Sequence, residues 1–424
     1  MSLQGAMVVV ADNPAPDIVD ALGAAGAFPV VESRWTDAPS AFISVQPAAI
    51  VLAEPGPASD PKAADTLGLQ LQTRSGPFIP LIGRARSDLG MAIPGGLPID
   101  AEASATRLVA RLQMALRVRA LHAAVLRRME TFTSQDGIAA PTLPQTDPVD
   151  DATVLVAGRG RSYPSLAVAV GERVGLIGAL SVETAAKYLG AREVDGVVVG
   201  DGFSPRVVEA LLAAMAEDAR FRDLPIALAS GTPALLNEFG PKLVNLEIVN
   251  GDPRAWIDWI LPLVRLHAFD ARLKRVMQAF DSQGMVDPQT GLLTRVSFWR
   301  DLSSAMQHAA KRGVSLSVAR FTFGPVLERR ASMDTARLVS RIVRNIDFAC
   351  QGSDGSILCV FTGTDLHAAH VISRRIASVL KHTMLTSEGG RPKLETHITL
   401  GTLKATDTAD SLLARVGAEA FAAG

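Results

Sequence analysis

Arg344 and Asp347 are the two residues whose types and spacing best suit the chemistry of ligand recognition. They form an Arg-x-x-Asp pattern, and Ser353, which begins a Ser-Asp-Gly-Ser turn, follows Asp347 by six residues. A guanidinium can donate two parallel hydrogen bonds to an acceptor group such as a phosphate, and a carboxylate accepts hydrogen bonds from N–H donors. The same pair at helical i, i+3 spacing can also form an exposed ion pair that contributes little to stability.

Other residues of types that can bind metals or take part in catalysis are isolated along the chain. Asp354 stands alone in its turn, where Asp-Gly favours a hairpin. The seven histidines include His367 and His370 at i, i+3 spacing, but they show no HExxH or comparable metal-binding pattern. We expect this pair to be solvated or packed. Cys350 and Cys359 match no metal-binding or CxxC spacing, so we expect both to pack as small apolar residues in a reducing compartment.

The composition indicates a soluble chain of several domains. Its 424 residues correspond to about three domains, and a hydrophobic content of 48% can give each domain a core. The formal net charge of −1 argues against a nucleic-acid partner, for which a basic face is expected. No basic region precedes the short apolar run at the N-terminus, and no apolar run approaches the ~18 residues of a spanning helix. We therefore expect a cytoplasmic protein without membrane insertion.

Apolar strands alternate with helices twice along the chain. The first occurrence predicts strands at residues 7–11, 48–53 and 78–82 and helices at residues 18–25 and 103–121. The second predicts strands at residues 153–157, 174–177, 196–199, 225–229 and 246–249. This alternation indicates parallel sheets covered by helices on both faces, and the similar order predicts two repeats of one fold.

The C-terminal part of the chain has a mixed pattern that predicts an α+β domain with an antiparallel sheet. We expect helices at residues 296–310, 335–346, 366–380 and 409–423, strands at 316–323 and 396–400, and a hairpin at 347–361. A long helix is predicted at residues 256–280. The predicted segments are a first domain at residues 1–130, a linker at 131–151, a second domain at 152–268, a connecting helix at 269–285 and a third domain at 286–424.

Both repeats resemble the receiver domains of response regulators, which implies two flavodoxin-like, doubly wound parallel sheets. In that family, acidic residues bind magnesium, an aspartate after the third strand accepts a phosphoryl group, and a hydroxyl and a lysine assist. The first repeat keeps Asp12 but has Glu54 one residue after the acceptor position and Arg84 where the hydroxyl belongs. The second has Asp201 one residue late and Ser230 as the hydroxyl. We therefore expect modules for docking or dimerisation, or for placing the third domain, without a phosphoacceptor.

The strongest local pattern is Asp287-Pro-Gln-Thr-Gly-Leu-Leu-Thr-Arg295, followed by Phe298 and Leu302. It resembles the Asp-x-Leu-Thr-Gly-Leu-x-Asn-Arg segment that begins the catalytic domain of diguanylate cyclases. The run His397-Ile-Thr-Leu-Gly401 resembles a late strand of the same family. The resemblance covers about 140 residues and implies a GGDEF-like domain with the nucleotidyl cyclase fold. The order receiver–receiver–GGDEF resembles response regulators of cell-cycle and surface-attachment control.

The same resemblance implies that catalysis has been lost. Diguanylate cyclases need two metal-binding carboxylates, one after the first strand of the domain and one in the signature turn. Phe321 or Thr322 occupies the first position here, and only Asp354 remains in the turn. One carboxylate cannot assemble a two-metal site, so we expect no catalytic residues, no cofactor and no enzyme activity.

Among the functional sites of diguanylate cyclases, the inhibitory site is the one whose residues this sequence matches. Diguanylate cyclases often carry Arg-x-x-Asp just before the signature turn, where it binds cyclic di-GMP. Arg344 and Asp347 match this pattern, and Arg375 (or its neighbour Arg374) matches a further arginine of the next helix. The resemblance implies a cyclic di-GMP effector that acts through signalling partners, and we expect a homodimer. Two alternatives remain, which are a structural adaptor that binds no nucleotide and a weakly active cyclase.

Overall fold

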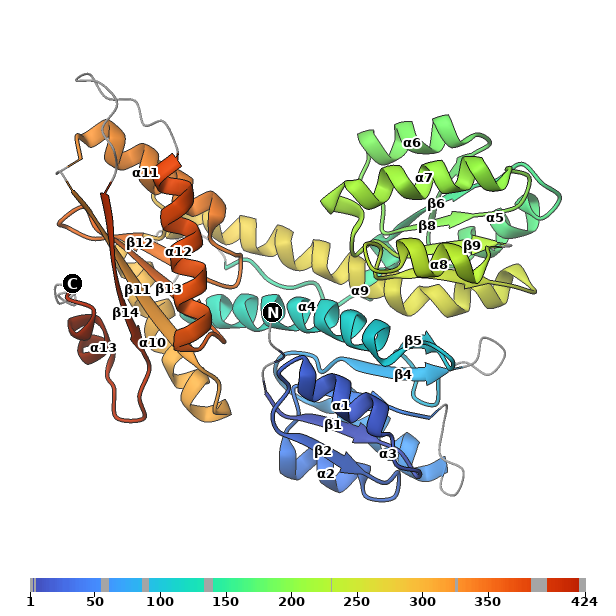
Figure 1. Ribbon diagram of the computed structural model, residues 1–424, viewed down its shortest axis with the longest axis horizontal. Helices are drawn as coiled ribbons and strands as arrows, with labels where there is room; N and C mark the ends of the chain where they lie inside the picture. The colour runs from blue at the N-terminus through green and yellow to red at the C-terminus, as the bar shows by residue number, and fades with distance from the viewer. Residues whose placement is uncertain are drawn as a thin grey trace. The chain divides into compact units, whose positions relative to one another are not determined.

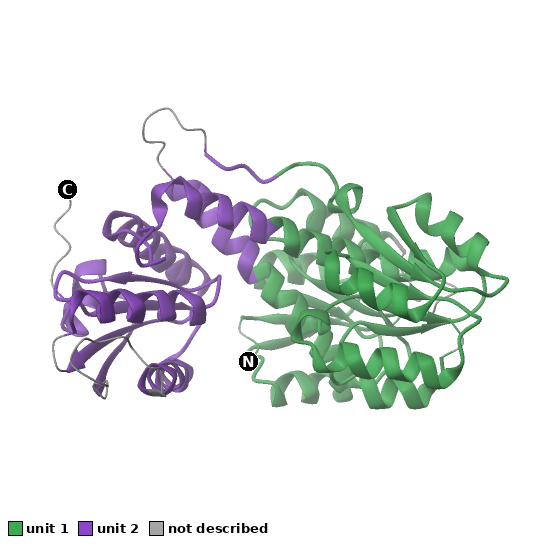
Figure 2. Cartoon of the chain, turned by 90° about the horizontal axis from the view of Figure 1, so that it is seen from above, with its two compact units in different colours: residues 1–119, 144–272 green, residues 120–143, 273–424 purple. Residues whose placement is uncertain are grey.

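The computed structural model describes two compact units, which Figure 2 shows in different colours. It describes residues 3, 5–54, 61–85, 91–132, 140–229, 231–324, 327–382 and 395–418. The first unit contains Met1–Arg119 and Pro144–Arg272, and the second contains residues 120–143 and Leu273–Gly424. The boundary falls inside two long helices, α4 (Ala105–Thr131) and α9 (Pro253–Phe280). The finer division into five segments remains a prediction.

A parallel five-stranded sheet with the order β2-β1-β3-β4-β5 forms the N-terminal part of the first unit (Figure 1). Its elements are β1 (Met7–Val10), α1 (Pro16–Ala24), β2 (Val30–Ser33), α2 (Ala38–Val45), β3 (Ala49–Leu52), α3 (Pro61–Thr73), β4 (Leu81–Ala85) and β5 (Leu97–Asp100). Strands β1 and β3 are buried along their whole length, as expected for strands covered on both faces. Phe42 of α2 and Leu67 of α3 pack into the core of this sheet.

A second parallel sheet follows in the same unit, with the order β10-β9-β8-β6-β7. Its elements are η1 (Pro148–Asp151), β6 (Thr153–Ala157), α5 (Tyr163–Gly171), β7 (Gly175–Ala179), α6 (Val182–Ala191), β8 (Gly196–Val199), α7 (Pro205–Glu217), η2 (Ala219–Phe221), β9 (Ile226–Ala229), α8 (Pro233–Phe239) and β10 (Leu246–Val249). Numbered within each repeat, both sheets have the order 2-1-3-4-5, which flavodoxin-like folds share. The predicted repetition is therefore confirmed at the level of strand order.

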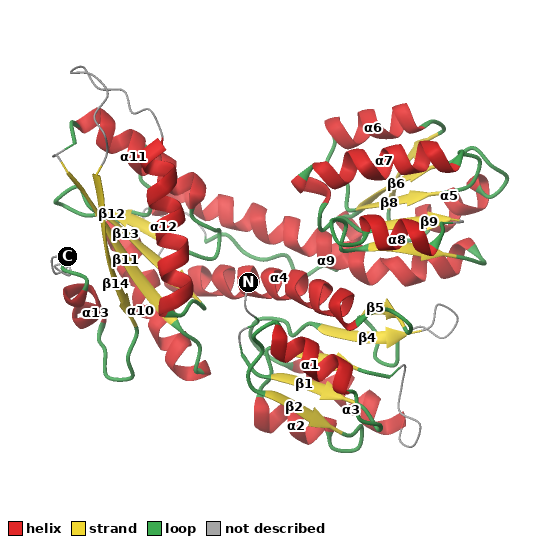
Figure 3. Ribbon diagram, viewed as in Figure 1, coloured by secondary structure: helices red, strands yellow, loops and turns green. Residues whose placement is uncertain are grey.

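The two repeats differ between their fourth and fifth strands (Figure 3). In the second repeat, α8 occupies this position and buries Leu235 and Phe239 in the core. In the first repeat, the described residues between β4 and β5, which are residues 91–96, form bends and turns rather than a helix. Ile93 is the residue of this turn that is buried in the core.

The buried Arg111 and the partly buried Arg107 attach α4 to the second repeat. Arg111 is fully buried, and its guanidinium donates hydrogen bonds to the Pro98 and Val244 carbonyl groups and to the Glu247 carboxylate. Arg107 donates to the same carboxylate at 2.8 Å. Burial lowers the pKa of Arg111, and the charge of Glu247 acts in the opposite direction. Glu247 therefore compensates two arginine charges on one helix.

The second unit contains an antiparallel sheet with the order β12-β13-β11-β14, which confirms the predicted α+β arrangement. Its elements are η3 (Asp281–Met285), α10 (Arg295–Arg312), β11 (Leu316–Gly324), α11 (Arg329–Ile342), β12 (Phe348–Gln351), β13 (Ile357–Thr362), α12 (Leu366–His382), β14 (Glu395–Thr402) and α13 (Ala409–Arg415). Helices α11 and α12 pack on one face of this sheet through residues such as Val339 and Ile376. The predicted hairpin at residues 347–361 is confirmed as β12 and β13.

Several predicted elements differ in extent from the structure. The helix predicted at residues 409–423 is α13, which ends at Arg415. The helix predicted at residues 103–121 continues as α4 to Thr131, into the predicted linker, because residues such as Val125 remain buried. The helix predicted at residues 335–346 is α11, which ends at Ile342. The strand predicted at residues 78–82 is β4, which begins after Pro80, a residue that has no N–H to donate to a neighbouring strand. Within the described part of the chain, no helix is long and apolar enough to cross a bilayer.

Replacement of Glu247 by alanine should strongly destabilise the first unit. The change leaves Arg111 buried without its carboxylate, and breaking a buried pair in this way costs about 3–5 kcal/mol of unfolding free energy. Urea unfolding followed by tryptophan fluorescence measures this loss, because Trp35, Trp256 and Trp259 all belong to the first unit and only one of the four tryptophans does not.

The matched control is Glu217→Ala, which removes an ion pair with Lys242 whose two side chains are exposed. This variant should unfold at nearly the wild-type urea concentration, because exposed pairs contribute little. Equal shifts in the two variants would show that burial of the Arg111–Glu247 pair does not determine its contribution.

Candidate functional site

Arg344 and Asp347 lie in one turn between α11 and β12. The Asp347 N–H donates a hydrogen bond to the Arg344 carbonyl oxygen at 2.9 Å. The expected helical spacing of the pair is therefore wrong, because α11 ends two residues before Arg344. Arg344 is partly exposed, and its side chain forms no hydrogen bond or ion pair with any residue that the structure describes. Its charge nevertheless acts on the neighbouring Asp347 carboxylate.

The Asp347 carboxylate is mostly buried, with 5% of the residue exposed, and is held by β13. Its Oδ1 accepts hydrogen bonds from the Thr362 N–H at 2.9 Å and from the Thr362 hydroxyl at 3.4 Å. The hydrogen bonds that join this carboxylate to other described residues are made through Oδ1. One oxygen therefore fixes the carboxylate to the sheet, while the other retains its capacity to accept.

Burial dominates the electrostatics of Asp347. It raises the pKa of this carboxyl to about 7, although the hydrogen bonds from Thr362 and the charges of Arg344 and Arg127 act to lower it. Arg127, near the end of α4, lies over the Phe348 ring at 5.3 Å from its centroid. Burial, followed by the charge of Asp347, raises the pKa of the Cys359 thiol. Asp347 is therefore an acid that titrates near neutral pH.

The end of α4 is fixed to the second unit by acidic residues. Arg128 donates hydrogen bonds to Asp281 at 2.9 Å and to the fully buried Asp301 at 3.4 Å. The Thr131 hydroxyl donates to the other oxygen of Asp301 at 3.0 Å. Burial lowers the pKa of Arg127, and the charges of Asp301 and Asp347 oppose this shift. Asp347 thus belongs to a buried group of charges as well as to the candidate site.

Arg375 lies on α12, the helix that packs against α11. Both Arg375 and its neighbour Arg374 are exposed. No hydrogen bond or ion pair between described residues joins Arg375 to Arg344 or Asp347. The structure therefore brings Arg344 and Asp347 together in one turn and places Arg375 on a separate element of the same unit.

The turn between β12 and β13, which the sequence predicts to correspond to the signature turn, is closed by an internal ion pair. Asp354, between β12 and β13, accepts hydrogen bonds from the Ser356 hydroxyl at 2.6 Å and from Arg320 of β11 at 2.5 Å. Burial acts to raise the pKa of Asp354, but the hydrogen bonds from Ser356 and Arg320 outweigh it and lower the pKa. Phe321, at the predicted position of the other carboxylate, is fully buried in the core.

Other candidate metal ligands do not gather into a site. Among the residues whose placement is described, no group of three or more His, Cys, Asp or Glu side chains could hold a metal ion. His367 and His370 are both exposed on α12. Cys350 and Cys359 are free and buried, which confirms that they pack as apolar residues.

In the first repeat, Glu54 and Arg84 at the carboxyl ends of the strands have partners, whereas Asp12 Oδ2 is buried without a hydrogen bond among the described residues. Glu54 accepts hydrogen bonds from the Asn13 side chain at 2.8 Å and from the backbone N–H groups of Asp12 and Asn13. Arg84 forms an ion pair with Asp17 at 2.6 Å. Glu54 thus stabilises the loop after β1.

Polar side chains at the same ends of the strands in the second repeat also form hydrogen bonds within that repeat. Asp201 accepts a hydrogen bond from the Ser162 hydroxyl, and Arg159 donates to the Gly202 carbonyl oxygen at 2.8 Å. Ser230, the expected hydroxyl of this repeat, lies outside the described residues. The absence of a phosphoacceptor in either repeat remains a prediction.

Sequence reasoning missed three residues that define these sites. Arg320 pairs with Asp354, Arg127 contributes to the electrostatics of Asp347, and Thr362 holds its carboxylate. An arginine inside the apolar strand β11 was a usable signal, because a charge in such a strand needs a partner. The role of Arg127 has no comparable signal, since α4 is distant from Asp347 in the chain.

Comparison with known proteins finds similarity to solved GGDEF domains over about a third of the chain. No family model and no curated protein matches. The coiled coil and GGDEF domain of DgcB from Caulobacter crescentus, in complex with c-di-GMP, is 14% identical with a TM-score of 0.30, covering 35% of this chain and 84% of that one. The FimX GGDEF domain from Pseudomonas aeruginosa is 17% identical with a TM-score of 0.29, covering 31% and 89%.

The pKa of Asp347 predicts how the stability of the second unit depends on pH. Because its folded-state pKa of about 7 exceeds its ordinary value of 3.8, the folded state binds more protons than the unfolded chain between these values. The unfolding free energy should therefore fall as pH rises from about 4 to 7. Asp347→Asn should remove this decline, which scanning calorimetry at pH 5.5 and pH 8 can measure.

Asp354→Asn provides the control for this measurement. The pKa of Asp354 is lowered, so this carboxylate is ionised in both states throughout the range from pH 5.5 to 8. Its replacement should leave the slope of stability against pH unchanged. A wild-type slope in the Asp347→Asn variant would contradict the assignment of the raised pKa.

Proposed function

We propose that the protein is a cyclic di-GMP effector whose C-terminal, GGDEF-like domain makes no product. The observation that carries the proposal is the turn of Arg344 and Asp347. This turn places the partly exposed Arg344 guanidinium near the Asp347 carboxylate, whose Oδ1 is held by Thr362 and whose ionised form the charge of Arg344 favours. It lies immediately before a hairpin, where the family's inhibitory pattern is expected.

The geometry suits a ligand that carries guanine and phosphate groups. The Arg344 guanidinium can donate two hydrogen bonds to guanine O6 and N7, and Asp347 Oδ2 can accept from guanine N1 and N2. Arg375 is exposed on α12 and can contact a phosphate. The three residues thus offer donors and an acceptor in the combination that a guanine dinucleotide requires.

Loss of catalysis is supported by the pair between Arg320 and Asp354. A guanidinium at 2.5 Å already occupies the carboxylate that would bind magnesium, and an apolar residue stands at the other ligand position. A metal ion would have to displace an ionised partner and would then find a single protein carboxylate. Two-metal phosphoryl transfer is therefore not expected.

The two receiver-like repeats are proposed to transmit the bound state to signalling partners. They offer no complete set of phosphorylation residues, so their expected function is docking, in a cytoplasmic protein that acts as a homodimer. Without nucleotide binding, the same architecture would act as a structural adaptor.

Calorimetric titration of cyclic di-GMP into the full chain tests the proposal. We expect micromolar or tighter binding, weakened about tenfold to a hundredfold in Arg344→Ala through loss of a bidentate contact. Arg341→Ala, at an exposed position in α11, is the matched control and should bind like the wild type. Failure of the wild type to bind would leave the structural adaptor as the function.

A second comparison decides which arginine of α12 contacts the ligand. Arg375→Ala should weaken binding and Arg374→Ala should not, although both residues are exposed on the same helix. The same affinity in both variants would remove Arg375 from the site.

Incubation with GTP and Mg²⁺ or Mn²⁺ tests the absence of catalysis. We expect no cyclic di-GMP, because the second carboxylate for a two-metal site is missing. Chromatography of the nucleotides after prolonged incubation measures the product. Formation of cyclic di-GMP by the purified protein, at a rate that scales with its concentration, would establish a weak cyclase instead.

A further inference from the structure

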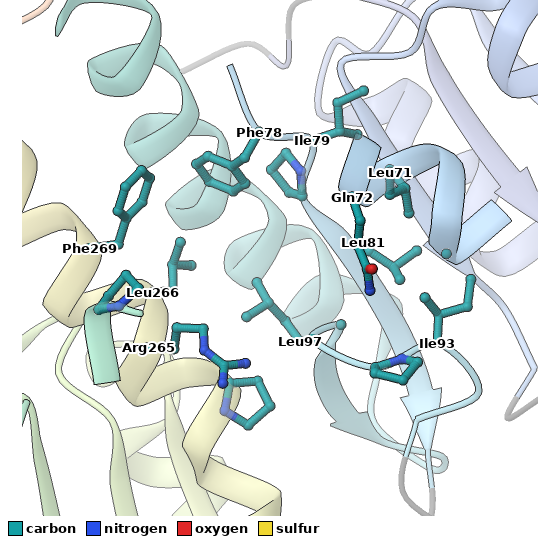
Figure 4. A pocket seen from close by; sticks show the side chains of 17 residues that line it. Leu71, Gln72, Phe78, Ile79, Leu81, Ile93, Leu97, Arg265, Leu266 and Phe269 are labelled. Carbon is teal, nitrogen blue, oxygen red and sulfur yellow. The ribbon is translucent and has the colours of Figure 1, made fainter. Parts of the chain in front are cut away.

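The first unit contains a pocket of about 320 Å³ beside the turn that residues 91–96 form in the first repeat (Figure 4). Its walls come from α3, from β4 and β5 with the turn between them, and from α9 of the second repeat. In the second repeat, α8 follows the fourth strand and fills the corresponding position with Leu235 and Phe239. In the first repeat, the described residues 91–96 form a turn. These six residues therefore supply no helix to fill the space between α3 and α9.

The lining of this pocket is apolar with a cation at one side. Aliphatic side chains come from both repeats, among them Leu71, Leu81, Leu97 and Leu266. Phe78 and Phe269 meet edge to face with ring centroids 5.7 Å apart and form an aromatic wall.

Arg265 is the charged residue among those that line the pocket. Its Nε donates to Asp147 Oδ1 at 3.0 Å, and the two side chains are 38% and 45% exposed. An ion pair as exposed as this one holds its partners weakly. An incoming anion can therefore replace Asp147 at the guanidinium without leaving an unpaired buried charge.

We infer that this pocket binds a small amphipathic anion. An apolar body of about ten carbons would lie against the leucine and phenylalanine side chains, and a carboxylate would replace Asp147 on Arg265. The volume falls within the range of small-molecule sites, which is roughly 300–1,000 Å³. Burial of the apolar body supplies the affinity, and the guanidinium supplies the preference for an acid.

Such a ligand would contact both receiver-like repeats at once. Leu71 and Leu81 belong to the first repeat, whereas Leu266 and Phe269 lie on α9, after the last strand of the second. Occupancy would therefore stabilise the packing of the two repeats on each other. The site is independent of the candidate nucleotide site, which lies in the second unit, so failure of one proposal leaves the other intact.

Decanoate and decanol are suitable probes because they share an apolar chain and differ in charge. Titration calorimetry with the full chain should show one decanoate bound per protein and weaker binding of decanol. Leu71→Trp places a larger ring in the pocket and should weaken decanoate at least about tenfold. Leu69→Trp is the matched control, because Leu69 is an exposed residue of the same helix that does not line the pocket.

The ion pair provides a second test that leaves the pocket wall intact. Arg265→Gln should abolish the preference for decanoate over decanol. Asp147→Asn should tighten decanoate and leave decanol unchanged, because it removes the competing carboxylate. Asparagine can still accept the N–H of Val149 that caps η1. Absence of decanoate binding, or wild-type binding by Leu71→Trp, would overturn the assignment.

Discussion

The arginines that α4 buries must be matched by carboxylates, and this requirement shapes both units. In the first unit, Arg111 is fully buried against Glu247, and in the second, Arg128 reaches the fully buried Asp301. A buried arginine without its carboxylate would lower the free energy of unfolding by several kcal/mol. The fold therefore needs both the arginines of α4 and the carboxylates that face them. Asp347 belongs to the same set through the charge of Arg127. A ligand that binds Asp347, as proposed, would therefore alter the surroundings of an α4 arginine as well.

Two turns of the second unit each bring an arginine near an aspartate, but the two pairs differ in how they interact. At the hairpin, Arg320 pairs with Asp354, so the remaining carboxylate is neutralised within the sheet. Before the hairpin, Arg344 is partly exposed and acts on Asp347 through its charge, without a hydrogen bond between the two described side chains. A hydrogen-bonded ion pair stabilises a turn, whereas a partly exposed cation near a carboxylate can still contact a ligand. The proposed loss of catalysis and the proposed gain of a binding role rest on this difference.

Local pattern was sufficient to predict the strands of the second repeat and the hairpin, because each is a short apolar run bounded by turn residues. Element ends that depend on tertiary contacts were not predictable. Helix α4 extends to Thr131 because its last turns bury side chains in the second unit, and α8 is too short to show a clear period. The pattern Arg-x-x-Asp was visible in the sequence. The burial of Asp347 and its bond to Thr362 were not, because they depend on how β12 pairs with β13.

The central claim is that Asp347 acts as an ionised acceptor for a guanine. The pH dependence of cyclic di-GMP affinity tests this claim most directly, because burial raises the pKa of Asp347 to about 7. A carboxylate that must be ionised to accept two hydrogen bonds predicts affinity that rises about tenfold between pH 6 and pH 8. Asp347→Asn should bind weakly and without this dependence. Affinity that is unchanged by pH and by the Asp347→Asn substitution would contradict the account.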